Sequence, residues 1–193
     1  MRTHFIGNAL LFLVLASVIF TSGCVSSAVT LRLPFDTDNT PLFLVPMGET
    51  LNHPAEMVKG GHNGIDFAWG NNTSNKIMAS ADGKVAYMKF SEETNFKIEI
   101  DHGAYTTMYY YLHKSLVIEG QVVKKGEIIG YARSMHWGFS GNAAFTQAGK
   151  SLCPVAYLDG DSQAVLAKIP LEDSMKEAGY ASACEGDYMV IGT

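Results

Sequence analysis

The chain has 193 residues, of which 47% are apolar and 17% are charged, and its formal net charge at neutral pH is −5. A chain of this length can bury one hydrophobic core with a small appendage, which leaves no room for two full domains. The acidic balance excludes the basic surface that nucleic-acid binding requires, so we expect no nucleic acid among its partners.

The first 23 residues are predicted to be an export signal. A basic residue, Arg2, precedes an apolar run over residues 9–20. A run of about twelve apolar residues is shorter than the roughly 20 that a membrane-spanning helix needs, so we expect this segment to be cleaved. Its end, Thr-Ser-Gly-Cys at residues 21–24, resembles a lipoprotein processing box and predicts a lipid on Cys24 that anchors the protein to a membrane. Secretion without a lipid and an uncleaved anchor are the alternatives.

Three further parts follow the signal. We expect a tether over residues 24–40, a single β domain over residues 41–160 and a C-terminal extension over residues 161–193. Prolines and short polar residues at the end of the tether favour turns over regular structure. The first half of the extension has a helical pattern, which Pro170 is expected to interrupt.

Many short strand patterns separated by turn residues make up the β domain. Two dipeptides favour tight turns: Asp82-Gly83, which would pair the strands on its two sides, and His102-Gly103. The expected strands cover residues 42–46, 76–81, 84–90, 95–101 and 105–112, with two more inside residues 117–130. Short strands at this spacing predict an all-β fold, an antiparallel β-sandwich or barrel-like single domain.

The chain contains three cysteines. If Cys24 carries a lipid, Cys153 and Cys184 are the remaining pair, and an exported protein keeps such a pair oxidised more often than not. We therefore expect a disulfide that ties the C-terminal extension to the β domain. Two buried thiols are the alternative.

Four short motifs follow one another in the β domain. They are His-Asn-Gly-Ile-Asp at residues 62–66, Ala-Ser-Ala-Asp-Gly-Lys-Val at 79–85, Ile-Glu-Ile-Asp-His-Gly at 98–103 and Val-Lys-Lys-Gly-Glu-Ile-Ile-Gly at 123–130. Their order resembles the LytM or lysostaphin type of zinc metallopeptidase, enzymes that cut the peptide cross-links of bacterial cell walls. The resemblance covers roughly residues 40–160 and implies the fold of that family, the duplicated hybrid motif.

The resemblance implies a zinc site made of His62, Asp66 and His136. His62 and Asp66 occupy the first motif of the family, and His136 matches the second histidine of its last motif. Two imidazoles and one carboxylate are a known set of ligands for catalytic zinc, and they leave a fourth position open. In a second possible register, residues 140–145 take the place of the last motif, which then contains no histidine.

Two catalytic histidines of the family are replaced in this sequence. Tyr111 takes the place of one and Ser134 takes the place of the other. A tyrosine can donate a hydrogen bond to an oxyanion, but with an ordinary pKa of about 10 it is a poor base at neutral pH. His113 becomes the general base if a bulge shifts its strand by two residues. Without that shift it is a surface histidine.

The sequence therefore predicts an exported, lipid-anchored protein of the cell envelope that binds zinc. It takes peptidoglycan or other peptides as ligand or substrate, with reduced or altered endopeptidase activity. The main alternative is a catalytically inactive domain that binds peptidoglycan or regulates a wall-hydrolase partner. A metal-free structural lipoprotein of the envelope is the third hypothesis.

Overall fold

The computed structural model describes residues 29–48, 61–141 and 151–185. The predicted export signal and the predicted lipidation site, Cys24, lie outside these ranges. Within the described ranges, no helix has the length and the apolar character needed to cross a membrane.

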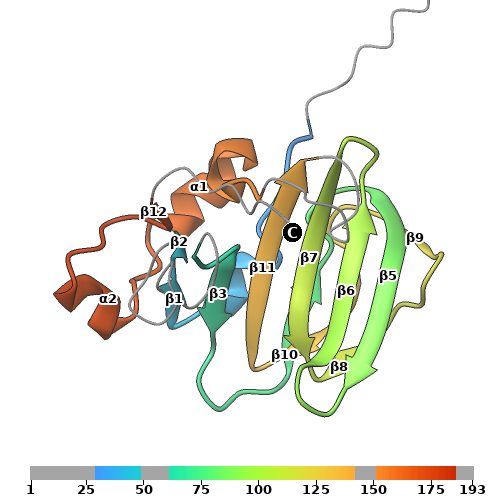
Figure 1. Ribbon diagram of the computed structural model, residues 1–193, viewed down its shortest axis with the longest axis horizontal. Coiled ribbons are helices and arrows are strands. Elements are labelled where there is room, and N and C mark those ends of the chain that lie inside the picture. The colour runs from blue at the N-terminus through green and yellow to red at the C-terminus, as the bar shows by residue number, and fades with distance from the viewer. Residues whose placement is uncertain (1–28, 49–60, 142–150, 186–193) are drawn as a thin grey trace, which may run out of the picture.

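Antiparallel strands form most of the fold (Figure 1). The main sheet has seven strands in the order β1-β3-β11-β7-β6-β5-β9, and a second sheet has three in the order β4-β10-β8. The strands of the main sheet are β1 (Phe43–Val45), β3 (Ile65–Ala68), β5 (Gly83–Ser91), β6 (Asn95–Asp101), β7 (Tyr105–Leu112), β9 (Val122–Val123) and β11 (Ser134–Gly141). Those of the second sheet are β4 (Asn75–Met78), β8 (Lys114–Ser115) and β10 (Ile128–Ala132). The predicted all-β fold is confirmed, and the main sheet is open, because it ends at β1 and β9 among the described strands.

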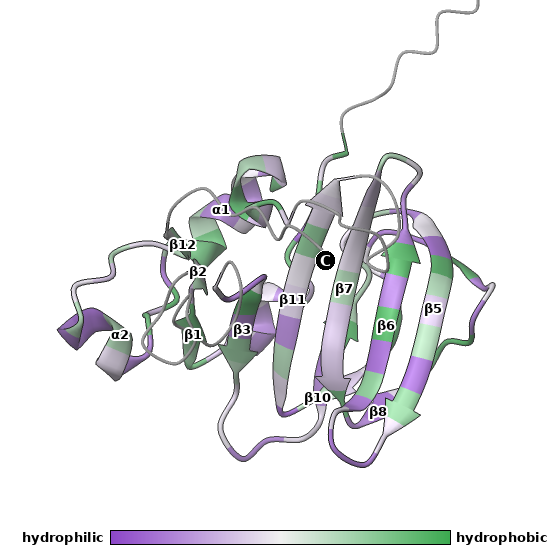
Figure 2. Cartoon of the chain, viewed as in Figure 1, coloured by the Kyte–Doolittle hydropathy of each residue, from purple (hydrophilic) through white to green (hydrophobic). Residues whose placement is uncertain are grey.

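The hydrophobic core lies between the two sheets. Strand β6 alternates apolar and polar residues (Figure 2), and its Ile98 and Ile100 are fully buried. Ile77 on β4 and Ile129 on β10 belong to the same buried cluster, so the second sheet covers one face of the main sheet. Burial of each such side chain is worth roughly 1.5–3 kcal/mol. The alternate positions of the main-sheet strands point to the opposite face, which carries the candidate site.

The strands on the two sides of Asp82-Gly83 do not pair with each other, which corrects the predicted hairpin. Strand β4 pairs with β10, whereas β5 pairs with β6 and β9. The chain changes sheet at residues 79–82 because their polar groups bond to the turn at residues 124–127. Lys125 N donates to Asp82 Oδ1 at 2.8 Å, and Gly126 N donates to Ala79 O at 2.8 Å. By contrast, β6 and β7 pair with each other across the His102-Gly103 turn, as predicted.

A buried hydroxyl also fixes this change of sheet. The phenol oxygen of Tyr109 on β7 accepts hydrogen bonds from Ser80 N at 2.7 Å and from Thr107 Oγ1 at 3.0 Å. Tyr109 and Thr107 are fully buried. The Thr-x-Tyr pattern of this strand therefore ties β7 to the segment that passes from β4 to β5.

Part of the predicted tether packs on the β domain. Leu31, Leu33 and Phe35 are buried, and Leu31 N donates to Tyr157 O at 2.8 Å. A short 3-10 helix, η1 (Thr37–Asn39), follows before the main sheet begins.

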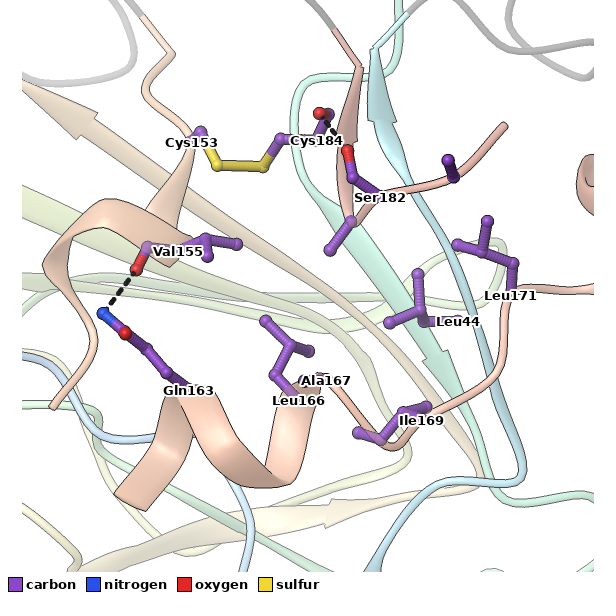
Figure 3. A pocket seen from close by; sticks show the side chains of 12 residues that line it. Leu44, Cys153, Val155, Gln163, Leu166, Ala167, Ile169, Leu171, Ser182 and Cys184 are labelled. Atoms are coloured by element: carbon purple, nitrogen blue, oxygen red, sulfur yellow. Dashed lines mark hydrogen bonds between the residues drawn. A yellow bond between two sulfur atoms is a disulfide. The ribbon is translucent and has the colours of Figure 1, made fainter. Parts of the chain in front are cut away.

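The C-terminal part of the chain folds back on the β domain. Its elements are the 3-10 helix η2 (Pro154–Tyr157), the helices α1 (Gly160–Leu166) and α2 (Asp173–Glu177), and strand β12 (Cys184–Glu185). The two α-helices lie on either side of Pro170, as expected. A disulfide joins Cys153 to Cys184, and β12 pairs in parallel with β2 (Met47–Gly48). Figure 3 shows the disulfide beside a mainly apolar cavity of about 460 Å³ that α1 and β12 help to line.

Candidate metal centre

Three separate segments bring the predicted metal ligands together. Asp66 lies on β3, and His136 lies directly opposite it on β11. His62 precedes β3 and is fixed by two backbone hydrogen bonds with Gly48 of β2, at 2.6 and 2.8 Å. The sheet register therefore sets the positions of Asp66 and His136, and the pairing with β2 sets that of His62.

The ligand atoms of the three side chains converge on one point. His62 Nε2 lies 3.1 Å from His136 Nδ1 and 3.2 Å from Asp66 Oδ1. His136 Nδ1 lies 2.8 Å from the same Asp66 oxygen. Both histidines are buried, whereas the Asp66 side chain keeps 32% of its surface exposed. The group is therefore reached from solvent on the side of the carboxylate.

This arrangement fits a zinc ion. Zinc bonds of about 2.0–2.1 Å in tetrahedral geometry place ligand atoms about 3.3 Å apart, slightly more than the 2.8–3.2 Å observed here. His62 Nδ1 donates to Pro46 O at 2.8 Å. When Nε2 gives up its proton, this tautomer directs the Nε2 lone pair at the point between Asp66 and His136 where a metal ion would sit. A small outward movement of the three side chains would admit the ion.

The charges of the three groups are coupled. Burial alone would raise the pKa of Asp66, but hydrogen bonds from His136 and His62 outweigh it and hold that pKa well below its ordinary value. Burial alone would lower the pKa of His62, but the hydrogen bond and the charge of Asp66 outweigh it, so the pKa of His62 is raised. Asp66 is therefore ionised at neutral pH, as a metal ligand must be.

A cavity of about 400 Å³ opens beside Asp66. Tyr111 and Ser134 line it, together with apolar residues of β1, β3 and β11. Tyr111 and Ser134, which replace the two catalytic histidines of the family, therefore both lie next to the candidate metal centre. Partial burial and the charge of Asp66 raise the pKa of Tyr111, so its phenol keeps its proton at neutral pH.

A β-bulge in β7 sets the direction of Tyr111. Phe96 of β6 pairs with Leu112 of β7, while Ile98 pairs with Tyr109, so β7 carries one extra residue between these pairs. Tyr111 has a φ of 70°, in the left-handed region that residues other than glycine rarely adopt. Backbone strain of this kind is often found at functional sites.

His113 is not among the residues that line this cavity. It is exposed, and its backbone N–H donates to Tyr131 O of β10 at 3.0 Å, where the chain passes into the second sheet. The bulge shifts the strand by one residue, whereas the predicted base role requires two. The assignment of His113 as general base stays a prediction.

Sequence reasoning missed a group that extends the site across the sheet. Tyr110 is the cross-strand partner of His136 on the other side from Asp66, and their rings stack with centroids 5.7 Å apart. The Tyr110 hydroxyl donates to Glu99 Oε1 at 2.7 Å, and Lys97 Nζ lies 4.9 Å from the Tyr110 ring centroid. The sequence did contain a signal for these residues. Successive residues of a strand point to opposite faces of the sheet. Because the apolar Ile98 is expected in the core, its neighbours Lys97 and Glu99 are expected on the opposite face.

The group His62, Asp66 and His136 has the donor set of a catalytic zinc site, and it stands on an all-β domain. Residues 60–148 match the model of peptidase family M23. An uncharacterized metalloprotease of Haemophilus influenzae is 39% identical over 88 residues, which are 44% of this chain and 18% of that protein. Residues 60–148 are therefore similar to peptidase family M23, which agrees with the resemblance to LytM-type enzymes seen in the sequence.

Solved structures share the fold. Csd3 of Helicobacter pylori superposes with a TM-score of 0.54 at 22% identity, over 78% of this chain and 39% of that one. A zinc containing peptidase from Vibrio cholerae superposes with a TM-score of 0.50 at 25% identity, over 58% of this chain and 37% of that one. The chain thus spans about a fifth of the Haemophilus protein and less than half of either of these structures.

Proposed function

We propose that this chain is a zinc-binding M23 domain that acts on peptides at the cell envelope, with less hydrolytic activity than relatives that keep both histidines. The convergence of His62, Asp66 and His136 within 3.2 Å carries this proposal. The similarity to the zinc containing peptidase of Vibrio cholerae supports zinc as the metal.

The residues of the candidate metal centre and its cavity have different roles in the proposed reaction. A zinc ion bound here supplies Lewis acidity, which polarises a peptide carbonyl and acidifies water. The side chains of His62, Asp66 and His136 would hold the ion. The protonated phenol of Tyr111 donates a hydrogen bond to the carbonyl oxygen of the bound peptide, where negative charge develops. Ser134 offers a second hydroxyl on the wall of the same cavity.

The missing element is a general base. Apart from the metal ligand Asp66, no described residue that lines the cavity has a side chain that accepts a proton at neutral pH. General base catalysis contributes roughly 10²- to 10⁴-fold to a rate, so we expect turnover to be lower by about that factor. This observation also favours the second candidate function, a domain that binds peptidoglycan or regulates a wall-hydrolase partner without cutting.

The cell envelope is the compartment we propose. A disulfide between Cys153 and Cys184 is typical of an oxidising environment outside the cytoplasm. Export, a lipid on Cys24 and attachment to a membrane belong to this proposal, as does peptidoglycan as the source of the peptide.

The first test is metal content. Residues 25–193, purified without added metal, are expected to contain about one zinc ion per chain by elemental analysis, because the donor set is complete. His62→Ala and His136→Ala should each remove it. A wild-type protein that takes up no zinc even on incubation with the ion would contradict the proposal and favour a metal-free envelope protein.

Turnover separates the peptidase from the binding domain. The zinc-loaded protein is incubated with peptidoglycan and with glycine-rich peptides, and released fragments are measured by mass spectrometry. We expect slow cleavage that Tyr111→Phe reduces about 10- to 1,000-fold while zinc is retained, because one oxyanion donor is lost. His113→Ala serves as the matched comparison. If His113→Ala loses cleavage while Tyr111→Phe keeps it, the general base is His113. Binding without any cleavage would favour the second candidate.

A further inference from the structure

The face of the main sheet that carries the metal centre continues across β7, β6 and β5. Ile98 and Ile100 point into the core, so Lys97 and Glu99 of β6 point to the opposite face. Tyr110 stacks on His136 and lies between the metal centre and these two side chains. A peptide bound at the metal and running across the strands would therefore meet them.

The negative charge on this face already has partners. Glu99 is half-buried and accepts a hydrogen bond from the Tyr110 hydroxyl at 2.7 Å. Burial raises the pKa of Glu99, although the hydrogen bond from Tyr110 and the charge of Lys97 act in the opposite direction. Glu99 is thus held as an internal acceptor that orients the Tyr110 ring.

The positive charge of Lys97 has no comparable hydrogen-bonded partner among the contacts of the described residues. Lys97 Nζ lies over the Tyr110 ring, 4.9 Å from its centroid, which fixes the ammonium group by a cation–π contact. No ion pair with a carboxylate is formed by Lys97 within the described part of the chain. Its cross-strand partner on β5 is another lysine, Lys89. Like charges directly opposite each other repel, and an anion bound beside them would relieve this repulsion.

We propose that Lys97, supported by Lys89, is a specificity-determining residue that binds a carboxylate of the peptide ligand. The inference rests on the proposed function and names the class of peptide that this site takes. The centroid separations of 5.7 and 4.9 Å place the ammonium within about 11 Å of the His136 ring. An extended peptide advances about 3.3–3.6 Å per residue, so the carboxylate belongs to a residue at most about three positions from the bond at the metal. It is either a side-chain carboxylate or the C-terminal carboxylate of a short peptide.

The test compares peptides that differ in one charge. Fluorescein-labelled hexapeptides of glycine and alanine carry a glutamate at each position in turn, and each has a counterpart with glutamine. A second pair differs only in a free or an amidated C-terminus, which distinguishes the two sources of the carboxylate. Dissociation constants are measured by fluorescence anisotropy on the zinc-loaded wild-type protein, on Lys97→Gln and on the charge-matched control Lys168→Gln. Lys168 is exposed in the C-terminal extension.

We expect the wild type and Lys168→Gln to bind one carboxylate peptide about tenfold more tightly than its neutral counterpart. Lys97→Gln should bind the two equally, and Lys97→Glu should prefer the neutral peptide. The preference should weaken at high salt because a partly exposed ion pair is screened. Equal binding of the charged and neutral peptides by the wild type, or an unchanged preference in Lys97→Gln, would overturn the inference alone. Failure of the zinc-loaded wild type to bind any of the peptides would instead count against the proposed function.

Discussion

Gly64 supports the candidate metal centre by its lack of a side chain. A Cβ at this position would lie 2.6 Å from His136 Nε2 and 2.6 Å from Trp137 O. The carbonyl of Trp137 belongs to β11, which pairs with β3 and cannot retreat without loss of ladder hydrogen bonds. The His136 ring would have to turn away from Asp66 instead. Gly64 is not at a left-handed φ, so the glycine of the His-x-Gly-x-Asp motif is needed for close approach and not for a turn.

The first prediction follows from this contact. Gly64→Ala should weaken zinc affinity about 10- to 100-fold, because a ligand that is displaced loses its orientation, and overpacking should lower the free energy of unfolding by about 1–3 kcal/mol. Competition with a fluorescent chelator and thermal unfolding measure the two effects. Gly160→Ala is the control, since a Cβ there meets no atom within 4 Å. Wild-type zinc affinity in Gly64→Ala would show that His136 is not a ligand.

Some residues of the site could be predicted from the sequence and others could not. His62 and Asp66 stand in one short motif with fixed spacing, and the structure brings both to His136. The bulge at Tyr111 could not be predicted, because a run of aromatic residues specifies a strand but not its irregularities. Lys97 and Glu99 gave no signal of function, since alternating charges on a strand usually mark a solvated face.

At the scale of elements, Asp159 determines where α1 begins. Its side chain accepts a hydrogen bond from Ser162 N at 2.9 Å as the N-cap, and its second oxygen accepts one from Lys125 Nζ at 3.1 Å. Burial alone would raise the pKa of Asp159, but the hydrogen bonds from Ser162 and Lys125 outweigh it and lower that pKa. A lowered pKa in the folded state means that the stabilisation is present above the ordinary carboxyl pKa and is lost as pH falls through the folded value.

The second prediction uses this sign. Asp159→Ala should lower the free energy of unfolding by about 1 kcal/mol at pH 7, as expected for a lost N-cap. The difference from the wild type should shrink below about pH 4, where the carboxylate becomes protonated. Urea unfolding at pH 7 and pH 3 measures both values, with Asp159→Asn as a control that keeps the cap and loses the ion pair. An equal difference at the two pH values would contradict the role of the charge.

Several strands could be predicted from the pattern of their residues, but which strands pair with each other was harder to predict. Strand β6 was expected because apolar residues alternate along it, and β7 because a run of aromatic residues favours a strand; a glycine turn joins the two. The pairing of β4 with β10 was not, because Asp82-Gly83 has the sequence of a hairpin turn. Hydrogen bonds to residues 124–127, which lie more than forty positions further along the chain, decide that region.

At the scale of the whole molecule, the C-terminal part is connected to the candidate metal centre through β2. The disulfide between Cys153 and Cys184 holds β12, which pairs with Met47 and Gly48 of β2. Gly48 in turn pairs with His62, and the neighbouring carbonyl of Pro46 accepts the hydrogen bond from His62 Nδ1. Figure 3 shows the disulfide at the edge of the cavity that separates α1 from this strand pair. The backbone that positions His62, a candidate metal ligand, is thus supported from outside residues 60–148, the segment that is similar to family M23.

The third prediction concerns this connection. A variant with both Cys153→Ser and Cys184→Ser removes a cross-link between residues 31 positions apart, which should lower the free energy of unfolding by about 3–4 kcal/mol through the entropy of the unfolded chain. Zinc affinity should also fall several-fold, because β2 loses its restraint and His62 is less well oriented. Denaturant unfolding and chelator competition measure the two quantities on the same samples. A fall in stability with unchanged zinc affinity would mean that the extension stabilises the fold without reaching the metal centre, whereas a parallel loss would make the redox state of this disulfide a determinant of metal binding.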